Sequence, residues 1–260
     1  MSPRRFAERL ARQAARVALA HARRPGQSSV RVTRKEDHTI VTRADRAIER
    51  IFVREIREAF PDHGILGEEG ARRGGSGRHL WALDPIDGTS AYSRGIPLYT
   101  ISIALLEDGV PRMGVVHFPA LRETYSAERG EGACEGARRL RKIPSPLPFG
   151  VETLLLLPSN AHRRYLIELA GKGRSLGSTA GHIAYVARGT AEAALCRGSL
   201  WDIAAAAVSL EEAGGALSYL SGRAIDWSEL ASGRIAPEAI LAAHPAALPE
   251  LRWRIARKPV

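Results

Sequence analysis

Apolar residues recur every three or four positions in two N-terminal segments, which is the spacing of a buried helix face. The first segment predicts a helix over residues 4–22 ended by Pro25-Gly26, and the second a helix over 43–60 ended by Pro61-Asp62. The residues with this spacing are Phe6, Leu10, Ala14 and Val17, and then Ile48, Ile51, Phe52 and Ile56. We interpret the first segment as an ordinary amphipathic helix rather than an Arg-rich transit peptide.

Short apolar runs follow, and they are typical of buried strands. Leu80–Leu83 is such a run and predicts a strand that ends at Asp84, after which the chain turns. The other predicted features are a strand over 64–67, a Gly- and Arg-rich loop over 71–78, and strands over 99–106 and 113–118 joined by a turn at 107–109.

A Pro-rich stretch from Ile143 to Pro148 predicts a lobe boundary. We expect an N-terminal α+β lobe over residues 1–145 and a C-terminal α/β lobe over 146–260. Helical and strand patterns alternate beyond the boundary: strand 152–157, helix 161–170, helix 179–188, strand 192–196 and helix 203–213.

Composition limits the class of protein. Hydrophobic residues make up 45% of the 260 positions, which is enough for a sizeable core, and no apolar run is long enough to span a bilayer. Two cysteines are too few for a disulfide framework, so the cytoplasm is the simplest compartment. The net charge of +10 attracts anions, whether phosphorylated metabolites or nucleic acid, and does not choose between them.

The segment Asp84-Pro-Ile-Asp-Gly-Thr-Ser90 has the strongest chemical pattern. A turn here lets Asp84 and Asp87 point into one space, where two carboxylates repel each other unless a cation lies between them. Hard oxygen ligands of this kind suit Mg²⁺. Thr89 and Ser90 begin a new segment whose backbone N–H groups could receive a phosphate. The alternative is a plain turn in which Ser90 is a helix N-cap.

Three further acidic positions have ordinary explanations when each is taken alone. Glu68 lies in a Gly-Glu-Glu-Gly loop, where acidic residues often serve solubility. Asp202 precedes an Ala-rich helix and Asp45 opens the second helix, and aspartates there are usually caps. The occurrence of all these acidic sites in one chain, in this order, favours a shared chemical role.

These motifs resemble those of the inositol monophosphatase family, within the lithium-sensitive, magnesium-dependent phosphatases. The resemblance is nearly full length and is strongest in Val41–Asp45, Phe60–Gly70, Asp84–Thr89, Trp201–Ala205 and Glu212–Gly215. It implies the layered αβαβα sandwich of the inositol monophosphatase and fructose-1,6-bisphosphatase type. It also implies a homodimer and hydrolysis of a small phosphate monoester.

The resemblance further implies two or three Mg²⁺ ions per subunit. Their ligands would be Glu68, Asp84, the carbonyl of Ile86, Asp87 and Asp202. Asp84 would bridge two ions, and Glu68 would help to hold a third. The N-terminal lobe would thus carry most ligands, and the C-terminal lobe would carry Asp202 and the loop on the substrate side.

The resemblance also implies catalytic and substrate-binding roles. Asp45 and Thr89, together with Glu68, would orient and activate the attacking water. The phosphate would lie on Gly88, Thr89 and Ser90, and the leaving group beside Gly177, Ser178 and Thr179.

The substrate stays open at this point. Inositol phosphate, histidinol phosphate, fructose 1,6-bisphosphate and a 3′-phosphonucleotide are the alternatives within the family. Family members that favour inositol 1-phosphate have an acidic residue seven positions before the metal-binding aspartate, where this chain has Leu195. An alternative of another class is an RNA-associated regulatory protein with a basic surface. Because the chain lacks a nucleic-acid motif and interleaved aromatics, we expect such binding to be weak and nonspecific at most.

Overall fold

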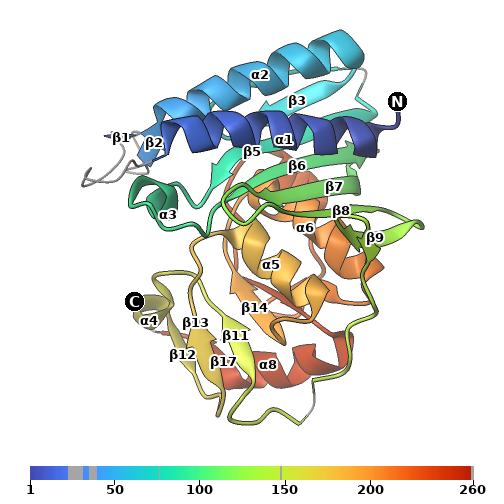
Figure 1. Cartoon of the computed structure of the whole chain (residues 1–260). Helices are drawn as coiled ribbons and strands as arrows, with labels where there is room; N and C mark the ends of the chain where they lie inside the picture. Colours follow the sequence, from blue (N-terminus) through green and yellow to red (C-terminus); the bar gives the residue numbers. More distant parts are fainter. Residues whose placement is uncertain (23–31, 35–39, 76, 147, 259–260) are drawn as a thin grey trace.

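The computed structural model describes residues 1–22, 32–34, 40–75, 77–146 and 148–258. Helices and sheets alternate in layers through this part of the chain (Figure 1). The helices are α1 Pro3–His21, α2 Arg43–Ala59, α3 Thr89–Ser93, α4 Ala161–Arg164, α5 Thr179–Arg188, α6 Leu200–Glu212, α7 Trp227–Ala231 and α8 Leu248–Arg254, with a 3₁₀ turn at Pro245–Ala247. Among the described residues, no helix combines the length and apolarity needed to cross a bilayer.

The larger sheet has the strand order β10-β9-β8-β7-β6-β5-β3-β4 in the described chain. Its strands are β3 Gly64–Gly67, β4 Arg72–Arg73, β5 His79–Asp87, β6 Thr100–Glu107, β7 Val110–Phe118, β8 Glu123–Glu128, β9 Gly132–Glu135 and β10 Arg138–Arg139. Neighbouring strands are antiparallel, except that β3 is parallel to β5. Helices α1 and α2 pack on one face of this sheet and α6 on the other.

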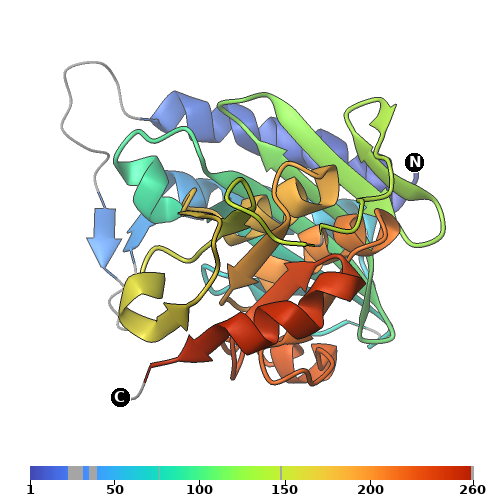
Figure 2. The same cartoon turned by 90° about the horizontal axis from the view of Figure 1, so that it is seen from below.

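The smaller sheet has the order β13-β11-β14-β16-β15 in the same described chain. Its strands are β11 Leu154–Leu156, β13 Lys172–Arg174, β14 Ala193–Cys196, β15 Ala216–Tyr219 and β16 Ile240–Ala243. Helices α5 and α6 lie between the sheets, and α8, the red helix near the C terminus, covers the outer face (Figure 2). The layers therefore run helix, sheet, helix, sheet, helix, which confirms the predicted αβαβα sandwich.

The two sheets are joined by the chain between β10 and β11, which includes most of the Pro-rich stretch; Leu147 lies outside the described residues. We propose this segment as the boundary between lobes 1–145 and 146–260. Helix α6 belongs to the second lobe in sequence but packs on β6 and β7 of the first. The lobes therefore share the middle layer of the core.

Helix α2 begins with a capping box that also fixes Asp45. Thr42 accepts hydrogen bonds from the backbone N–H groups of Ala44 and Asp45, and the Asp45 carboxylate accepts one from the N–H of Thr42 at 2.7 Å. Such reciprocal bonds satisfy backbone donors that the first turn leaves free. The buried stripe Ile48, Phe52 and Ile56 then holds the helix on the sheet.

Most predicted elements are confirmed within a few residues, although the stop signal Pro25-Gly26 lies outside the described residues. The helix predicted over 161–170 is wrong beyond Arg164. Residues Tyr165–Ile167 instead form β12, which pairs with β17, Ile255–Arg257. Burial alternates along β12, where Leu166 is exposed, and this period of two belongs to a strand. The partner strand lies near the C terminus, so the local pattern did not reveal it.

Two smaller corrections concern the first sheet. The predicted loop over 71–78 contains the short strand β4. The strand predicted to end at Asp84 continues to Asp87 through an irregularity in its pairing with β6. A further two-stranded sheet pairs β1, Val32–Arg34, with β2, Ile40–Thr42.

Candidate functional site

Three buried or half-buried aspartates meet between the sheets. Carboxylate oxygens of Asp84, Asp87 and Asp202 all lie within 4.8 Å of one another. Asp84 and Asp87 belong to β5, and Asp202 belongs to the first turn of α6. The side chains of Asp84 and Asp87 are almost fully buried.

A bulge in β5 explains how two aspartates three positions apart reach one face. In a regular strand such residues point to opposite faces. Here Asp84 lies opposite Ser102 and Asp87 opposite Thr100, so three steps along β5 match two along β6. The extra residue restores the same-face direction, as a bulge does, and Pro85 lies within it.

Asp202 is fixed by the start of α6. Its Oδ2 accepts a hydrogen bond from the backbone N–H of Ser199 at 2.6 Å, within a capping box. A Cβ on Gly198 would lie 2.6 Å from that same oxygen, so the position admits only glycine without rearrangement. Asp202 therefore both caps α6 and contributes a carboxylate oxygen to the cluster.

The electrostatics of the cluster are unfavourable without a counter-charge. Burial, followed by the charges of neighbouring carboxylates, raises the pKa of Asp84 and Asp202 well above the ordinary range. Burial also raises the pKa of Asp87 to about 6, although Ser178 and Ala180 oppose the shift by hydrogen bonding. Clustered carboxylate oxygens that resist ionisation together are a donor set that fits a divalent cation.

Glu68 and Asp45 lie close enough to interact with this cluster. The N–H of Glu68 donates to the carbonyl of Leu83 at 3.1 Å, which places Glu68 beside the end of the strand leading to Asp84. The charge of Glu68 is among the causes that raise the pKa of Asp84, Asp87, Asp202 and Asp45. Glu68 therefore interacts electrostatically with each of the other four predicted carboxylates.

Asp45 carries a buried oxygen that has no partner among the described residues. Its Oδ2 accepts from the backbone and hydroxyl of Thr42, whereas Oδ1 accepts no hydrogen bond there. Burial is the main cause that raises the pKa of Asp45 to about 6. An orphaned buried acceptor is costly in a folded protein and suggests an interaction with a bound group.

The predicted phosphate and substrate loops lie side by side. Gly88 has a φ of 96° and caps α3, and a Cβ there would lie 2.9 Å from the carbonyl oxygen of Gly177. Gly177 has a φ of 102° and in turn contacts Ala91. Only glycine meets both the backbone angle and the close approach without strain.

Hydroxyl groups tie these loops to the acidic cluster. Ser178 donates to Asp87 Oδ2 at 2.5 Å and caps α5, so its buried side chain positions the cluster and leaves only its backbone for a substrate. Thr179 next to it is half-buried. The hydroxyl of Thr89 donates to the carbonyl of Ile86 at 3.0 Å and does not bond Asp45. The exposed Ser90 hydroxyl accepts from Arg94.

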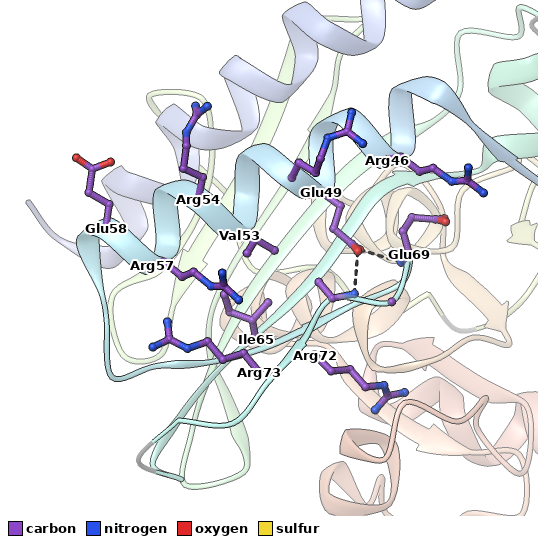
Figure 3. Close-up of a pocket in the computed structure, with 13 residues that line it drawn as sticks. Arg46, Glu49, Val53, Arg54, Arg57, Glu58, Ile65, Glu69, Arg72 and Arg73 are labelled. Carbon is purple, nitrogen blue, oxygen red and sulfur yellow. Dashed lines mark hydrogen bonds between the residues drawn. The ribbon is translucent and has the colours of Figure 1, made fainter.

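Glu49 is a site residue that the sequence analysis missed. Its two carboxylate oxygens accept hydrogen bonds from the N–H groups of Glu69 and Ala71, both at 2.8 Å (Figure 3). A Cβ on Gly67 would lie 2.3 Å from Glu49 Oε2. Glu49 therefore fixes the loop that carries Glu68. The sequence did indicate that Glu49 is buried, because it lies four residues after Asp45 and three before Phe52, on the same side of α2.

Comparisons with known proteins identify the family of this chain. The model of the inositol monophosphatase family matches residues 2–255. A histidinol-phosphatase of Chlorobaculum parvum is 40% identical over 207 residues, covering 76% of this chain and 79% of that protein. A Nus factor SuhB of Xylella fastidiosa is 37% identical over 224 residues, covering 82% and 80%. A solved IMPase of Thermotoga maritima has a TM-score of 0.82 and 32% identity, covering 96% of this chain and 94% of that one.

The chain therefore belongs to the inositol monophosphatase family. It is a phosphatase of the phosphoric monoester hydrolase class, and its substrates are small phosphorylated molecules. The family is metal-dependent, and this chain presents the acidic cluster that such chemistry requires.

Proposed function

We propose that this enzyme hydrolyses its phosphate monoester with two or three bound Mg²⁺ ions. The observation that carries the proposal is the convergence of Asp84, Asp87 and Asp202 oxygens within 4.8 Å in a buried setting that opposes their joint ionisation. Hard carboxylate and carbonyl oxygens favour Mg²⁺. The ligands would be these three aspartates, Glu68 and the carbonyl of Ile86.

Bound divalent cations would supply positive charge that acidifies water and neutralises the phosphate. The residues of the chain supply the remaining functions. Asp45 has a buried free oxygen and a pKa of about 6, so at neutral pH it is ionised and able to accept a proton from the attacking water. Thr89 orients that water through its hydroxyl. Glu49 keeps the Glu68 loop in register.

The phosphate would lie at the start of α3. The N–H groups of Gly88, Thr89 and Ser90 have no partners within the helix, as at any helix start. The adjacent segment Gly177-Ser178-Thr179 would contact the leaving group through its backbone and through Thr179. Close packing of Gly88 on Gly177 supports this arrangement.

We propose that inositol 1-phosphate is not the best substrate. Leu195 is fully buried in the core cluster that includes Leu155 and Leu241, so its side chain offers no polar contact to an inositol hydroxyl. A site that lacks such a partner discriminates poorly for a polyol. The similarity to a histidinol-phosphatase supports histidinol phosphate as an alternative, alongside fructose 1,6-bisphosphate and a 3′-phosphonucleotide.

The test is phosphate release from these four substrates, with Mg²⁺ or with chelator, by the wild type and by Asp84→Asn. We expect Mg²⁺-dependent release that the substitution nearly abolishes, and a lower kcat/KM for inositol 1-phosphate than for at least one other substrate. Release that persists in chelator would contradict the magnesium proposal. A clear preference for inositol 1-phosphate would contradict the Leu195 argument.

We further propose a homodimer in the cytoplasm. Family likeness supports the dimer, and the two free cysteines, Cys134 and Cys196, suit a reducing compartment. Sedimentation velocity at micromolar concentration tests the dimer, and a monomer would contradict it.

A further inference from the structure

A second charged feature lies outside the acidic cluster, in a groove of about 980 Å³ between α2 and the β3–β4 hairpin (Figure 3). Six arginines and three glutamates line it, together with small and apolar residues. Its floor includes Glu69–Arg73, the continuation of the loop that begins at Glu68. No aromatic side chain is among its lining residues.

Three of the arginines form a row on α2. Arg46, Arg50 and Arg57 are exposed, and at 3.6 residues per turn they fall within a sector of about 40°. The row is about 16 Å long, from eleven residues at 1.5 Å each. Arg73 extends it from β4, and Figure 3 shows Arg57 and Arg73 projecting into the same space. Within the described residues, none of these four arginines forms a salt bridge.

The other charges near the groove are already engaged or directed away. Arg54 pairs with Glu55 at 2.8 Å, and Arg72 approaches the carbonyl of Ser232. Both oxygens of Glu49 accept backbone hydrogen bonds. Glu58 points out of the groove in Figure 3. The field of the groove is therefore positive along its length, with Glu69 at one end.

We propose that this groove binds the phosphate backbone of a single-stranded nucleic acid, without reading its sequence. One compact phosphate cannot contact charges spread over about 16 Å, whereas a chain of phosphates can contact them in succession. The groove offers no aromatic ring on which a base could stack, so contacts to the phosphates would supply the affinity. Contacts to phosphate alone are nonspecific and fall steeply with salt.

The four unpaired arginines set the expected salt dependence of binding. If each arginine neutralises one phosphate, a plot of the logarithm of the association constant against the logarithm of the salt concentration has a slope of about −3. Affinity then drops about 50-fold between 50 and 200 mM salt. This matches an accessory interaction of an enzyme better than a dedicated, sequence-selective nucleic-acid receptor.

The test measures fluorescence anisotropy of labelled oligouridine and oligothymidine over a salt series. Arg50→Gln/Arg57→Gln should weaken binding about tenfold at 50 mM salt and reduce the slope by about 1.4. The matched control is Arg163→Gln/Arg164→Gln, which removes two exposed arginines from α4 in the other lobe. It should change affinity less than twofold. Phosphatase activity should be retained in both variants, so that failure here is separable from failure of the catalytic proposal.

Equal weakening by both double variants would overturn the proposal, because net charge alone would then explain the binding. Direct binding of labelled inorganic polyphosphate, together with no oligonucleotide binding, would overturn the proposal and assign the groove to a different polyanion. Conversion of a dimer to a monomer by Arg50→Gln/Arg57→Gln, measured by sedimentation, would make the groove a subunit interface. Tight binding without salt dependence would also contradict it.

Discussion

Two sets of like charges flank the loop 67–71, and they differ in burial. On one side, Asp84, Asp87 and Asp202 converge between the sheets, and burial is the first cause of their raised pKa values. On the other side, Arg46, Arg50 and Arg57 lie on an exposed helix face, where water screens them. Glu49 links the two regions, because it belongs to α2 and fixes the loop between them.

The difference shows what each cluster implies. Buried like charges destabilise the fold unless the groups take up protons or a counter-charge binds, so the aspartates form a site that favours a cationic ligand. Exposed like charges cost little and produce only a positive field, which attracts anions without demanding one. The first cluster is therefore evidence for a cofactor, and the second indicates a weak, salt-dependent interaction.

The largest expected effect comes from Asp84→Asn. We expect kcat/KM to fall by at least about 100-fold, because several kcal/mol of charge stabilisation depend on the metals. Glu69→Gln is the control, since Glu69 lines the arginine groove. Its kcat/KM should fall only slightly. Steady-state phosphate release at saturating Mg²⁺ measures the activity of both variants. Near wild-type turnover of Asp84→Asn would show that the aspartate cluster does not hold the catalytic metals.

Glu49→Gln should weaken the affinity for Mg²⁺ by about 10- to 100-fold, as substitutions behind metal ligands do. The expected cause is loosening of the loop that carries Glu68, so activity should recover partly at high Mg²⁺. The matched control is Glu58→Gln, an exposed acid on the same helix. An unchanged Mg²⁺ activation curve for Glu49→Gln would show that the loop holds its shape unaided.

A buried basic group, His182, tests whether burial sets the pKa values of side chains in this protein. The ring of His182 is buried, its Nε2 accepts from the N–H of Leu176 at 2.9 Å, and burial lowers its pKa from 6.5 to about 4. The unfolded chain therefore binds more protons between these values, and stability is complete above pH 6.5 and lost as pH falls toward 4.

His182→Gln keeps an acceptor without this titration. Relative to that variant, the wild type should lose about 2 kcal/mol of unfolding free energy between pH 7.5 and 5. Urea unfolding at both pH values measures the difference. Parallel pH dependence in the two proteins would mean that the ring protonates in the folded state at its ordinary pKa.

The smallest effect is expected on the exposed side. Arg57→Gln should change the unfolding free energy by no more than about 0.5 kcal/mol, since Arg57 is exposed and unpaired in the described structure. Urea unfolding at low salt is the measurement. A gain above about 1 kcal/mol would show that the arginines repel one another as strongly as the buried acids do.

Local patterns predicted much of the fold and of the site. The stripe Ile48, Phe52 and Ile56 predicted α2, and the string from Asp84 to Ser90 predicted the acidic centre. Long-range pairing was not predictable: β12 depends on β17 near the C terminus, and the bulge after Asp84 depends on its register with β6. Glu49 was missed because its partners lie on a loop twenty residues away.

The central claim is that the aspartate cluster is stabilised by bound Mg²⁺, and thermal unfolding tests it most directly. In chelator, Asp84→Asn should unfold at a higher temperature than the wild type, because asparagine removes a carboxyl group whose ionisation is opposed by burial and by its acidic neighbours. Saturating Mg²⁺ should raise the Tm of the wild type by roughly 5 °C and leave that of Asp84→Asn nearly unchanged. A wild type that does not respond to Mg²⁺, or a variant that responds equally, would contradict the account.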